Sequence, residues 1–149
     1  MTYPLSQSSF ADRSGPGLAA EMRTTIGALR AQENSDPDPR TLDRLRRARR
    51  QRDDFFSAKL FADPAWDMLL DLFAREIAQQ RVTVSNVCYV SGAPSTTALR
   101  YIELLRSEGL ITREPDPVDQ RRKFVRLTPA AVEGMRAYFR ALPKGVLPI

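Results

Sequence analysis

The chain has 149 residues, of which 42% are hydrophobic, and a formal net charge of +5 without any histidine. This length allows one domain with a core, and the charge favours an anionic partner such as nucleic acid. Histidine-based catalysis and histidine metal ligation are excluded, and neither common glycine-rich phosphate loop is present. We therefore expect no enzyme activity, no cofactor and no metal.

Other features of the composition bear on the compartment. The single cysteine, Cys88, excludes an internal disulfide. No stretch approaches the ~20 apolar residues of a membrane span, and the first residues do not follow a signal-peptide pattern. We expect a cytoplasmic, nucleoid-associated protein with no membrane partner.

The first 40 residues are predicted to be an N-terminal tail and linker. A short helix is predicted at 18–30, where Leu18, Met22, Ile26 and Leu29 fall on one helical face. A polar stretch with two Asp-Pro steps follows at 32–40. The folded domain is predicted to span residues 41–142, with a C-terminal tail at 143–149.

Two helices are predicted at the start of this domain. The first runs from Thr41 to about Leu60, with a broken apolar stripe made of Leu42, Leu45, Phe55, Phe56 and Leu60. Asp63-Pro64 then has the pattern of an N-cap followed by a proline in the first helical position. The helix that it opens carries one apolar face, formed by Trp66, Leu69, Leu70, Phe73 and Ile77.

The next segment has the pattern of a helix-turn-helix. A brief strand at 81–84 precedes a short helix at 86–91, for which Ser85 is the predicted cap. Gly92-Ala93-Pro94 interrupts the helix, and Ser95 is predicted to cap a second helix that runs to Glu108 and stops at Gly109. Two short helices joined by a turn that contains glycine are typical of this motif.

A β-hairpin is predicted directly after it. Strands at 110–113 and 123–127 flank a polar turn with two prolines, and Thr128-Pro129 opens a last helix that reaches about Leu142. The predicted fold is therefore mainly α with a small β-hairpin: a winged helix-turn-helix with flanking N- and C-terminal helices.

The second helix of the motif has the pattern of a DNA recognition helix. Ala98, Leu99, Ile102 and Leu105 cluster on one side, and Arg100 points away from them. Small hydroxyl side chains allow close approach to a groove, and arginine pairs bidentately with guanine. A solvated helix face is the alternative. The candidate contacts are Ser95, Thr96, Thr97, Arg100, Tyr101 and Ser107.

The hairpin turn carries a second candidate contact. Arg121, Arg122 and Lys123 are consecutive, and Asp119 stands two residues before Arg121. An aspartate at that spacing is expected to orient the guanidinium while leaving it able to reach phosphates or a narrow minor groove. Charge placed at a hairpin tip for solubility is the alternative.

The segment from Pro94 to Thr128 resembles the recognition helix and wing of the MarR family of bacterial regulators. The resemblance rests on the Ser-Thr-Thr start, Arg100, Leu105, Gly109-Leu110-Ile111, and Asp119-x-Arg121 ahead of Leu127-Thr128. It implies a dimer that binds duplex DNA, with Arg121 in the minor groove. Family members usually close with two helices that frame an effector pocket. Here about 20 residues follow Thr128, interrupted by Pro143 and Pro148, so the sequence leaves a small-molecule effector open.

Residues 40–52 contain seven arginines and one acid, Asp43. Three interpretations compete: a phosphate-contacting or DNA-bending arm, the solvated outer face of a dimer helix whose arginine stems cover apolar surface, or a site for RNA or acidic lipid. The candidate phosphate contacts are Arg44, Arg47 and Arg50.

The leading hypothesis is a sequence-specific transcriptional regulator that binds double-stranded DNA as a homodimer. The alternatives are a winged helix that binds or scaffolds other proteins, and a non-specific nucleic-acid-binding protein led by the arginine-rich helix. The predicted dimer seam consists of Leu42, Leu45, Phe55, Phe56, Val132, Met135, Tyr138 and Phe139.

Overall fold

The computed structural model describes Arg23 and residues 35–147. The chain divides into two compact units, Met1–Ser35 and Asp36–Ile149, and all helices and strands from Pro39 onward belong to the second. Apart from Arg23, the helix predicted at 18–30 lies outside the described residues. The second unit begins five residues before the predicted start of the domain at residue 41.

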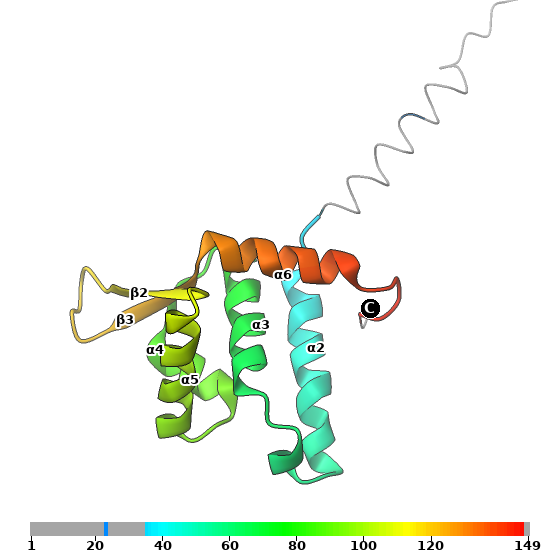
Figure 1. Ribbon diagram of the computed structural model, residues 1–149, viewed down its shortest axis with the longest axis horizontal. Helices are drawn as coiled ribbons and strands as arrows, with labels where there is room; N and C mark the ends of the chain where they lie inside the picture. Colours follow the sequence, from blue (N-terminus) through cyan, green and yellow to red (C-terminus); the bar gives the residue numbers. More distant parts are fainter. Residues whose placement is uncertain (1–22, 24–34, 148–149) are drawn as a thin grey trace, which may run out of the picture. The chain divides into compact units, whose positions relative to one another are not determined.

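The described elements follow the predicted order (Figure 1). They are α2 (Pro39–Gln51), two 3-10 turns (Arg52–Asp54 and Ala58–Leu60), α3 (Pro64–Ile77), β1 (Val82–Thr83), α4 (Val84–Ser91), α5 (Ser95–Ser107), β2 (Ile111–Pro115), β3 (Lys123–Leu127) and α6 (Pro129–Ala141). The strands form an antiparallel sheet in the order β1-β3-β2, in which Val125 pairs with Val82 on one side and Arg113 on the other. The winged helix-turn-helix prediction is confirmed.

Three helices begin with the same local signal, a capping side chain followed by proline. The side chains of Asp38, Asp63 and Thr128 accept hydrogen bonds from backbone N–H groups in the first turns of α2, α3 and α6. Proline fits the next position because its missing N–H would have no partner there. The sequence prediction used this signal for the two later helices and treated Asp38-Pro39 as linker, so it placed the start of α2 two residues late.

The predicted end of this helix, near Leu60, was also wrong. α2 ends at Gln51, and Phe55, Phe56 and Leu60 are exposed instead of sharing an apolar stripe with Leu42. The chain must reverse direction between Gln51 and Asp63 so that α3 can pack against α2. Because those residues form the reversal, they do not extend the helix.

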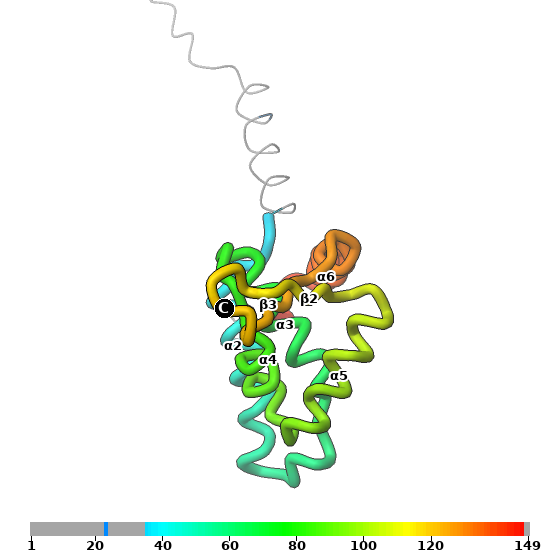
Figure 2. The backbone as a smooth tube through the Cα atoms, turned by 90° about the vertical axis from the view of Figure 1, so that its left-hand side faces the viewer, coloured from blue at the N-terminus to red at the C-terminus, as the bar shows by residue number. Residues whose placement is uncertain are grey.

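The core is built around α3, which lies between α2 and α5 in both views (Figures 1 and 2). α2 and α4 contact it most extensively, and the ring of Phe139 in α6 stacks on that of Phe73 at 5.7 Å between centroids. With neighbours on several sides, α3 buries Met68 and Leu72 in addition to part of the predicted apolar face, while Trp66, Leu69 and Ile77 are half-buried.

Candidate nucleic-acid interface

Residues at the two ends of α4 fix where this helix begins and where the chain turns toward α5. The Thr83 hydroxyl accepts a hydrogen bond from the backbone N–H of Asn86 at 3.3 Å, so Thr83 is the cap and the predicted cap, Ser85, lies inside the helix. Gly92 ends α4 with a φ of 67°, a left-handed conformation that glycine adopts without steric cost. Gly92 therefore lets the chain turn at the end of α4, and α5 begins at Ser95.

The start of α5 differs from the prediction. Ser95 is the first helical residue, and the capping position belongs to Pro94, which makes no side-chain hydrogen bond to the helix. The N–H groups of the first turn therefore have no capping side chain. Such groups are ready to donate to an anion, and the helix dipole adds to the attraction.

One side of α5 anchors the helix and the other is presented to solvent. Ala98, Ile102 and Leu105 are buried, whereas Arg100 is exposed and makes no hydrogen bond or ion pair with the residues that the structure describes. Leu99, predicted to share the buried side, is exposed because the apolar arc is wider than the surface that α3 and α4 cover. Arg100 is therefore free to reach a ligand.

The other predicted contacts on α5 divide into two groups. Ser95 and Thr96 are exposed, and Thr97 is half-buried. Tyr101 is partly buried against the core, and the Ser107 hydroxyl donates to the carbonyl of Leu104 at 2.8 Å, within its own helix. The freely available surface is thus concentrated in the first two turns of α5.

Glu103 also lies on the exposed side of α5, and sequence reasoning assigned it no role. Its carboxylate accepts hydrogen bonds from Arg106 at 3.1 Å and lies 3.9 Å from Arg113. The hydrogen bond from Arg106 lowers the pKa of Glu103, so the carboxylate stays ionised. A carboxylate in such a position can accept a hydrogen bond from the amino group of cytosine. The sequence signal that could have identified Glu103 is its position three residues from both Arg100 and Arg106 on the same helix.

The wing consists of β2, β3 and the loop at 116–122. Asp116 is buried and accepts a hydrogen bond from the backbone N–H of Val118 at 2.8 Å, and the chain closes where the N–H of Asp116 donates to the carbonyl of Arg122. Sequence reasoning did not single out Asp116, although an aspartate before a proline is a common turn signal. The tip is therefore a folded turn.

Asp119 has a different role from the predicted one. Its carboxylate accepts a hydrogen bond from the backbone N–H of Arg121 at 3.0 Å and does not hold the guanidinium. Arg121, Arg122 and Lys123 are all exposed, and they form no ion pairs within the described part of the chain. Asp119 thus shapes the backbone at the tip, and the cationic side chains remain available.

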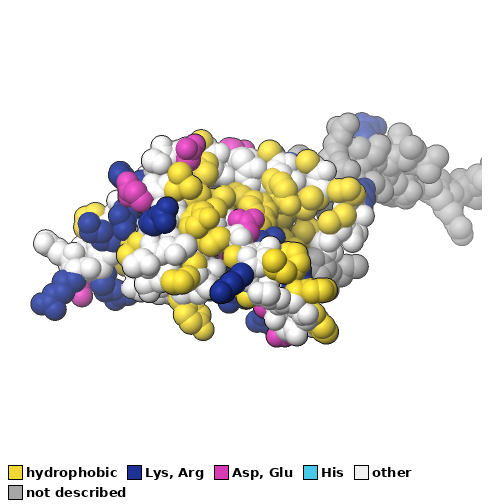
Figure 3. All heavy atoms as spheres, turned by 60° about the horizontal axis from the view of Figure 1, so that its bottom comes forward, with side chains coloured by type: hydrophobic (Ala, Val, Ile, Leu, Met, Phe, Trp, Pro, Cys, Tyr) yellow, Lys and Arg dark blue, Asp and Glu magenta, His cyan; other side chains and the backbone are white. Residues whose placement is uncertain are grey.

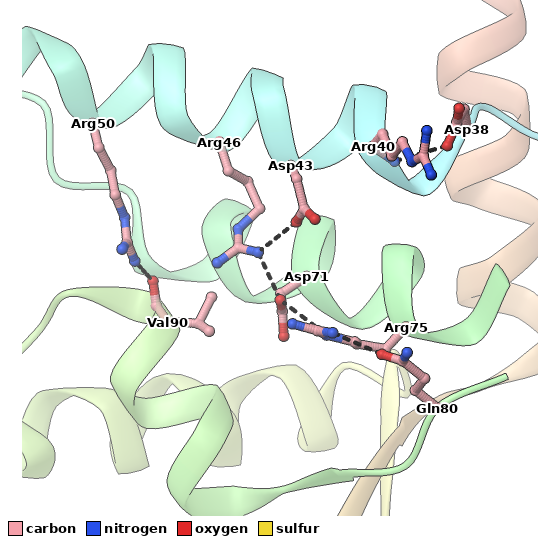
Figure 4. A network of polar contacts seen from close by, with 9 residues as sticks. All are labelled: Asp38, Arg40, Asp43, Arg46, Arg50, Asp71, Arg75, Gln80 and Val90. Carbon is pink, nitrogen blue, oxygen red and sulfur yellow. Dashed lines mark hydrogen bonds and ion pairs between the residues drawn. The ribbon is translucent and has the colours of Figure 1, made fainter. Parts of the chain in front are cut away.

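Two arginines of α2 pair with carboxylates of α3, and Figure 4 shows the contact of Arg46. Arg46 donates to Asp71 at 2.7 Å and Arg49 donates to Asp67 at 3.1 Å, while Arg50 donates to the backbone carbonyl of Val90 at the end of α4. Asp63, Asp67 and Asp71 are spaced four residues apart, so they form an acidic stripe along α3. That spacing was the sequence signal for the pairing.

Asp71 is the deepest charged group in this network. The residue is 1% exposed, and burial raises the pKa of its carboxyl even though Arg46 and Arg75 oppose that shift. Arg46 Nε is the only buried side-chain nitrogen or oxygen in the described residues that lacks a hydrogen-bond partner. The network therefore joins the two helices and also carries a desolvation cost.

These contacts revise the predicted phosphate ligands. Arg50 is bonded to α4, whereas Arg44 and Arg47 are exposed and unpaired among the described residues. Arg52 lies over the ring of Phe61, with its Cζ atom 5.0 Å from the centroid. Three of the six arginines of α2, Arg46, Arg49 and Arg50, therefore bond to other elements of the fold.

The predicted dimer seam is only partly available. Leu42, Met135 and Phe139 are buried in the core of a single chain, because α2 and α6 both pack on α3 and the sheet. Leu45 and Val132 are half-buried, and Tyr138 is exposed beside Trp66. Phe55 and Phe56 are the most accessible members of the predicted set.

Other kinds of site receive no support within the described residues. They contain no group of three or more side chains able to hold a metal ion, and none of their helices has the length and apolar character needed to cross a bilayer. Burial raises the pKa of the Cys88 thiol, which disfavours the reactive thiolate.

Comparisons with known proteins agree with the order of elements. Residues 75–131 match the family model described as "Winged helix DNA-binding domain", a stretch from the last turn of α3 into α6. No curated protein sequence matches the chain. This part of the chain is thus a winged helix by both its element order and its sequence.

Solved structures similar to the chain include MepR from S. aureus in its DNA-binding conformation, with 18% identity, a TM-score of 0.48, and coverage of 83% of this chain and 75% of that one. The S. aureus MepR-DNA complex has 18% identity and a TM-score of 0.47, with 80% of each chain covered. The heme sensor PefR from Streptococcus agalactiae has 12% identity and a TM-score of 0.46, with 85% and 74% covered. These values are low, so the fold assignment rests on the elements and the family match.

Proposed function

We propose that this protein is a transcriptional regulator that recognises a specific duplex DNA sequence as a homodimer. In this proposal the first two turns of α5 enter the major groove, and the wing contacts the adjacent minor groove or its phosphates. The match of residues 75–131 to a DNA-binding domain supports the general activity. Beyond DNA binding, we propose that the protein is sequence-specific, regulates transcription and is located in the cytoplasm.

The observation that carries the proposal is the state of Arg100. Its side chain is exposed and unpaired among the described residues, on a helix whose opposite side is locked into the core by Ala98, Ile102 and Leu105. A guanidinium on a rigid helix can pair bidentately with the N7 and O6 acceptors of guanine. An arginine that serves only to face solvent would also be exposed and unpaired. The anchored helix and the uncapped N-terminus next to Arg100 favour a ligand instead.

The wing supplies the second part of the surface. Basic side chains gather over the wing end of the molecule in Figure 3, where Arg121, Arg122 and Lys123 are exposed. Phosphate contacts from such residues provide affinity, whereas α5 provides the sequence preference. A non-specific protein led by α2 would have Arg44 and Arg47 for phosphate contacts, but not Arg46, Arg49 and Arg50, which are bonded to other parts of the chain.

Selection of duplexes from a random library by the full-length protein tests the proposal. We expect one enriched sequence with two inverted half-sites whose centres lie about 10 bp, or a multiple of that, apart. Its affinity should exceed that of random duplex by at least ~10³-fold at physiological salt. Equal affinity for selected and random duplexes would reject sequence-specific recognition.

A pair of matched variants then tests the role of α5. Arg100→Ala should cost about 1–3 kcal/mol on the selected duplex and remove discrimination at one base pair. Arg140→Ala removes the same charge from an exposed position in the last turn of α6 and should change binding little. If Arg100→Ala weakens selected and random duplexes equally, Arg100 does not read bases.

A further inference from the structure

The connection between α2 and α3 exposes a dense group of large apolar side chains. Phe55, Phe56, Leu60 and Phe61, named here the phenylalanine loop, are 74%, 60%, 71% and 40% exposed. Full burial of an aromatic side chain removes roughly 200 Å² from water, so the loop presents about 450 Å² of apolar surface. Patches of this size on a single chain commonly mark an interaction site.

The phenylalanine loop is already organised in the single chain. The rings of Phe56 and Phe61 pack edge to face with centroids 5.9 Å apart, and Arg52 lies over Phe61. Phe56 and Phe61 therefore have little side-chain freedom left to lose when a partner covers them, which favours binding by this half of the loop.

The outer side of α2 continues this surface. Arg44, Arg47, Ala48 and Gln51 are exposed along it, while Arg46 and Arg49 turn toward the carboxylates of α3. Asp53 and Asp54 follow directly and are exposed, and neither they nor Arg44 and Arg47 form an ion pair within residues 35–147. The surface is thus basic along the helix and acidic at its end.

We infer that the phenylalanine loop and the outer side of α2 form the seam with a second copy of this chain. The inference rests on the proposed homodimer and identifies its interface. A two-fold axis near Gln51, with the two α2 helices antiparallel, brings Asp53 and Asp54 of each copy against the arginines of the other. The phenylalanines then cover Ala48 and the aliphatic stems of Arg44 and Arg47. A two-fold seam must be self-complementary in this way.

Area and position agree with this arrangement. The two phenylalanine loops would bury about 900 Å² together, just below the ~1,000 Å² that a specific interface should exceed, and the α2 surfaces add to it. In Figure 1 the loop joins α2 to α3 at the lower right, and the wing extends to the far left. A second copy seated on the loop leaves both wings uncovered for DNA.

Light scattering of the full-length protein without DNA, from about 1 to 100 µM, tests the seam. We expect a dimer for the wild type and a monomer for Phe55→Ser/Phe56→Ser, with dimerisation weakened by about 30-fold or more. The matched control is Tyr89→Ser/Val118→Ser, which removes two exposed apolar side chains from α4 and the wing tip and should remain dimeric. Circular dichroism should show that all three are folded.

Charge reversal tests the pairing itself. Asp53→Lys/Asp54→Lys should weaken the dimer, and adding Arg44→Glu/Arg47→Glu to the same chain should restore it. A wild type that stays monomeric, or a phenylalanine variant as dimeric as the wild type, overturns the inference. Lack of rescue by the combined charge variant overturns the antiparallel register.

A binding assay separates this result from the fate of the proposed function. The monomeric phenylalanine variant should bind a duplex with one half-site as well as the wild type does, and should lose the added affinity for two half-sites. If neither protein prefers the selected duplex, DNA recognition fails, whereas the light-scattering result still decides the seam.

Discussion

Replacing Arg46 with methionine should destabilise the fold strongly, and replacing its partner Asp71 with asparagine should not. The side chain of Arg46 is 13% exposed and that of Asp71 is 1% exposed, so both groups are largely desolvated. Removing one member of a buried pair leaves the other charge uncompensated, at a cost of about 3–5 kcal/mol. The lower end applies to Arg46→Met, because Arg75 remains 3.6 Å from the carboxylate.

Asparagine at position 71 changes the balance differently. It keeps an oxygen that can accept from Arg46, and Arg46 still has Asp43 at 3.2 Å. It also removes the charge whose burial raises the pKa of Asp71. We expect a cost of about 1 kcal/mol or less for Asp71→Asn. Combining Arg46→Met with Asp71→Leu should recover most of the stability lost in Arg46→Met, since apolar replacements of buried ion pairs are often neutral.

The pH dependence has a definite sign. The folded pKa of Asp71 lies above its ordinary value of 3.8, so the folded chain retains a proton that the unfolded chain has lost in the interval between them. The contribution of this group to stability therefore decreases as pH rises through that interval. Without Arg46 the folded pKa should rise further, so the deficit of Arg46→Met should shrink as pH falls.

Urea unfolding followed by Trp66 fluorescence, at several pH values, measures these effects. An equal decrease in the free energy of unfolding in Arg46→Met and Asp71→Asn would refute the argument from buried charge. So would an Arg46→Met/Asp71→Leu variant that recovers none of the stability lost in Arg46→Met. A deficit of Arg46→Met that does not change with pH would refute the proton-linkage part.

Four further variants address the wing and the backbone. Arg121→Ala should weaken binding to nearly all duplexes and reduce the salt slope by roughly 0.9 for each phosphate that the wing no longer neutralises; an unchanged slope and affinity would exclude the wing from the interface. Asp119→Ala should produce a milder loss, because it loosens the turn that Asp119 closes on the Arg121 N–H. Gly92→Ala should lower stability by about 1–2 kcal/mol through its φ of 67° alone, because an added Cβ has open space around it. Gly134→Ala, also in open space but inside α6, should instead raise stability by about 0.5–1 kcal/mol. A free energy of unfolding that changes in the same direction in both glycine variants would contradict this reasoning.

The motif and its order could be predicted because their signals are local. Asp63-Pro64 and Thr128-Pro129 mark helix starts through hydrogen bonds that span three residues, and Gly109 ends α5 with a φ of 72°. The alternation of Lys123 to Leu127 predicted β3 with the observed bounds. The misplaced helix starts were also local errors: Ser85 was chosen as the cap instead of Thr83, and Asp38-Pro39 was assigned to the linker.

The candidate site could be predicted in outline and not in its contacts. Arg100 and the three wing cations are exposed, in agreement with the pattern that pointed to them, and their binding partners stay a proposal. Ser107 was placed on the correct side of α5, yet its hydroxyl is bonded to Leu104. Asp119 was found by its spacing from Arg121, but the spacing suits the backbone N–H as well as the guanidinium.

The amino-acid sequence by itself determined the order of the helices and strands and the approximate positions where they begin, because capping, proline geometry and glycine conformation depend on residues only a few positions apart. Only the tertiary structure decided which charged side chains are paired within the fold and which apolar side chains are buried in it. Arg46 meets Asp71 25 residues later, and Leu42 and Phe139 share a core although they are far apart in the chain. Phe55 and Phe56 are large and apolar like those core residues, but they lie in the chain reversal between α2 and α3, where no other element covers them. Burial depends on which surfaces the packed helices bring together, and that information is not contained in any single stretch of the chain.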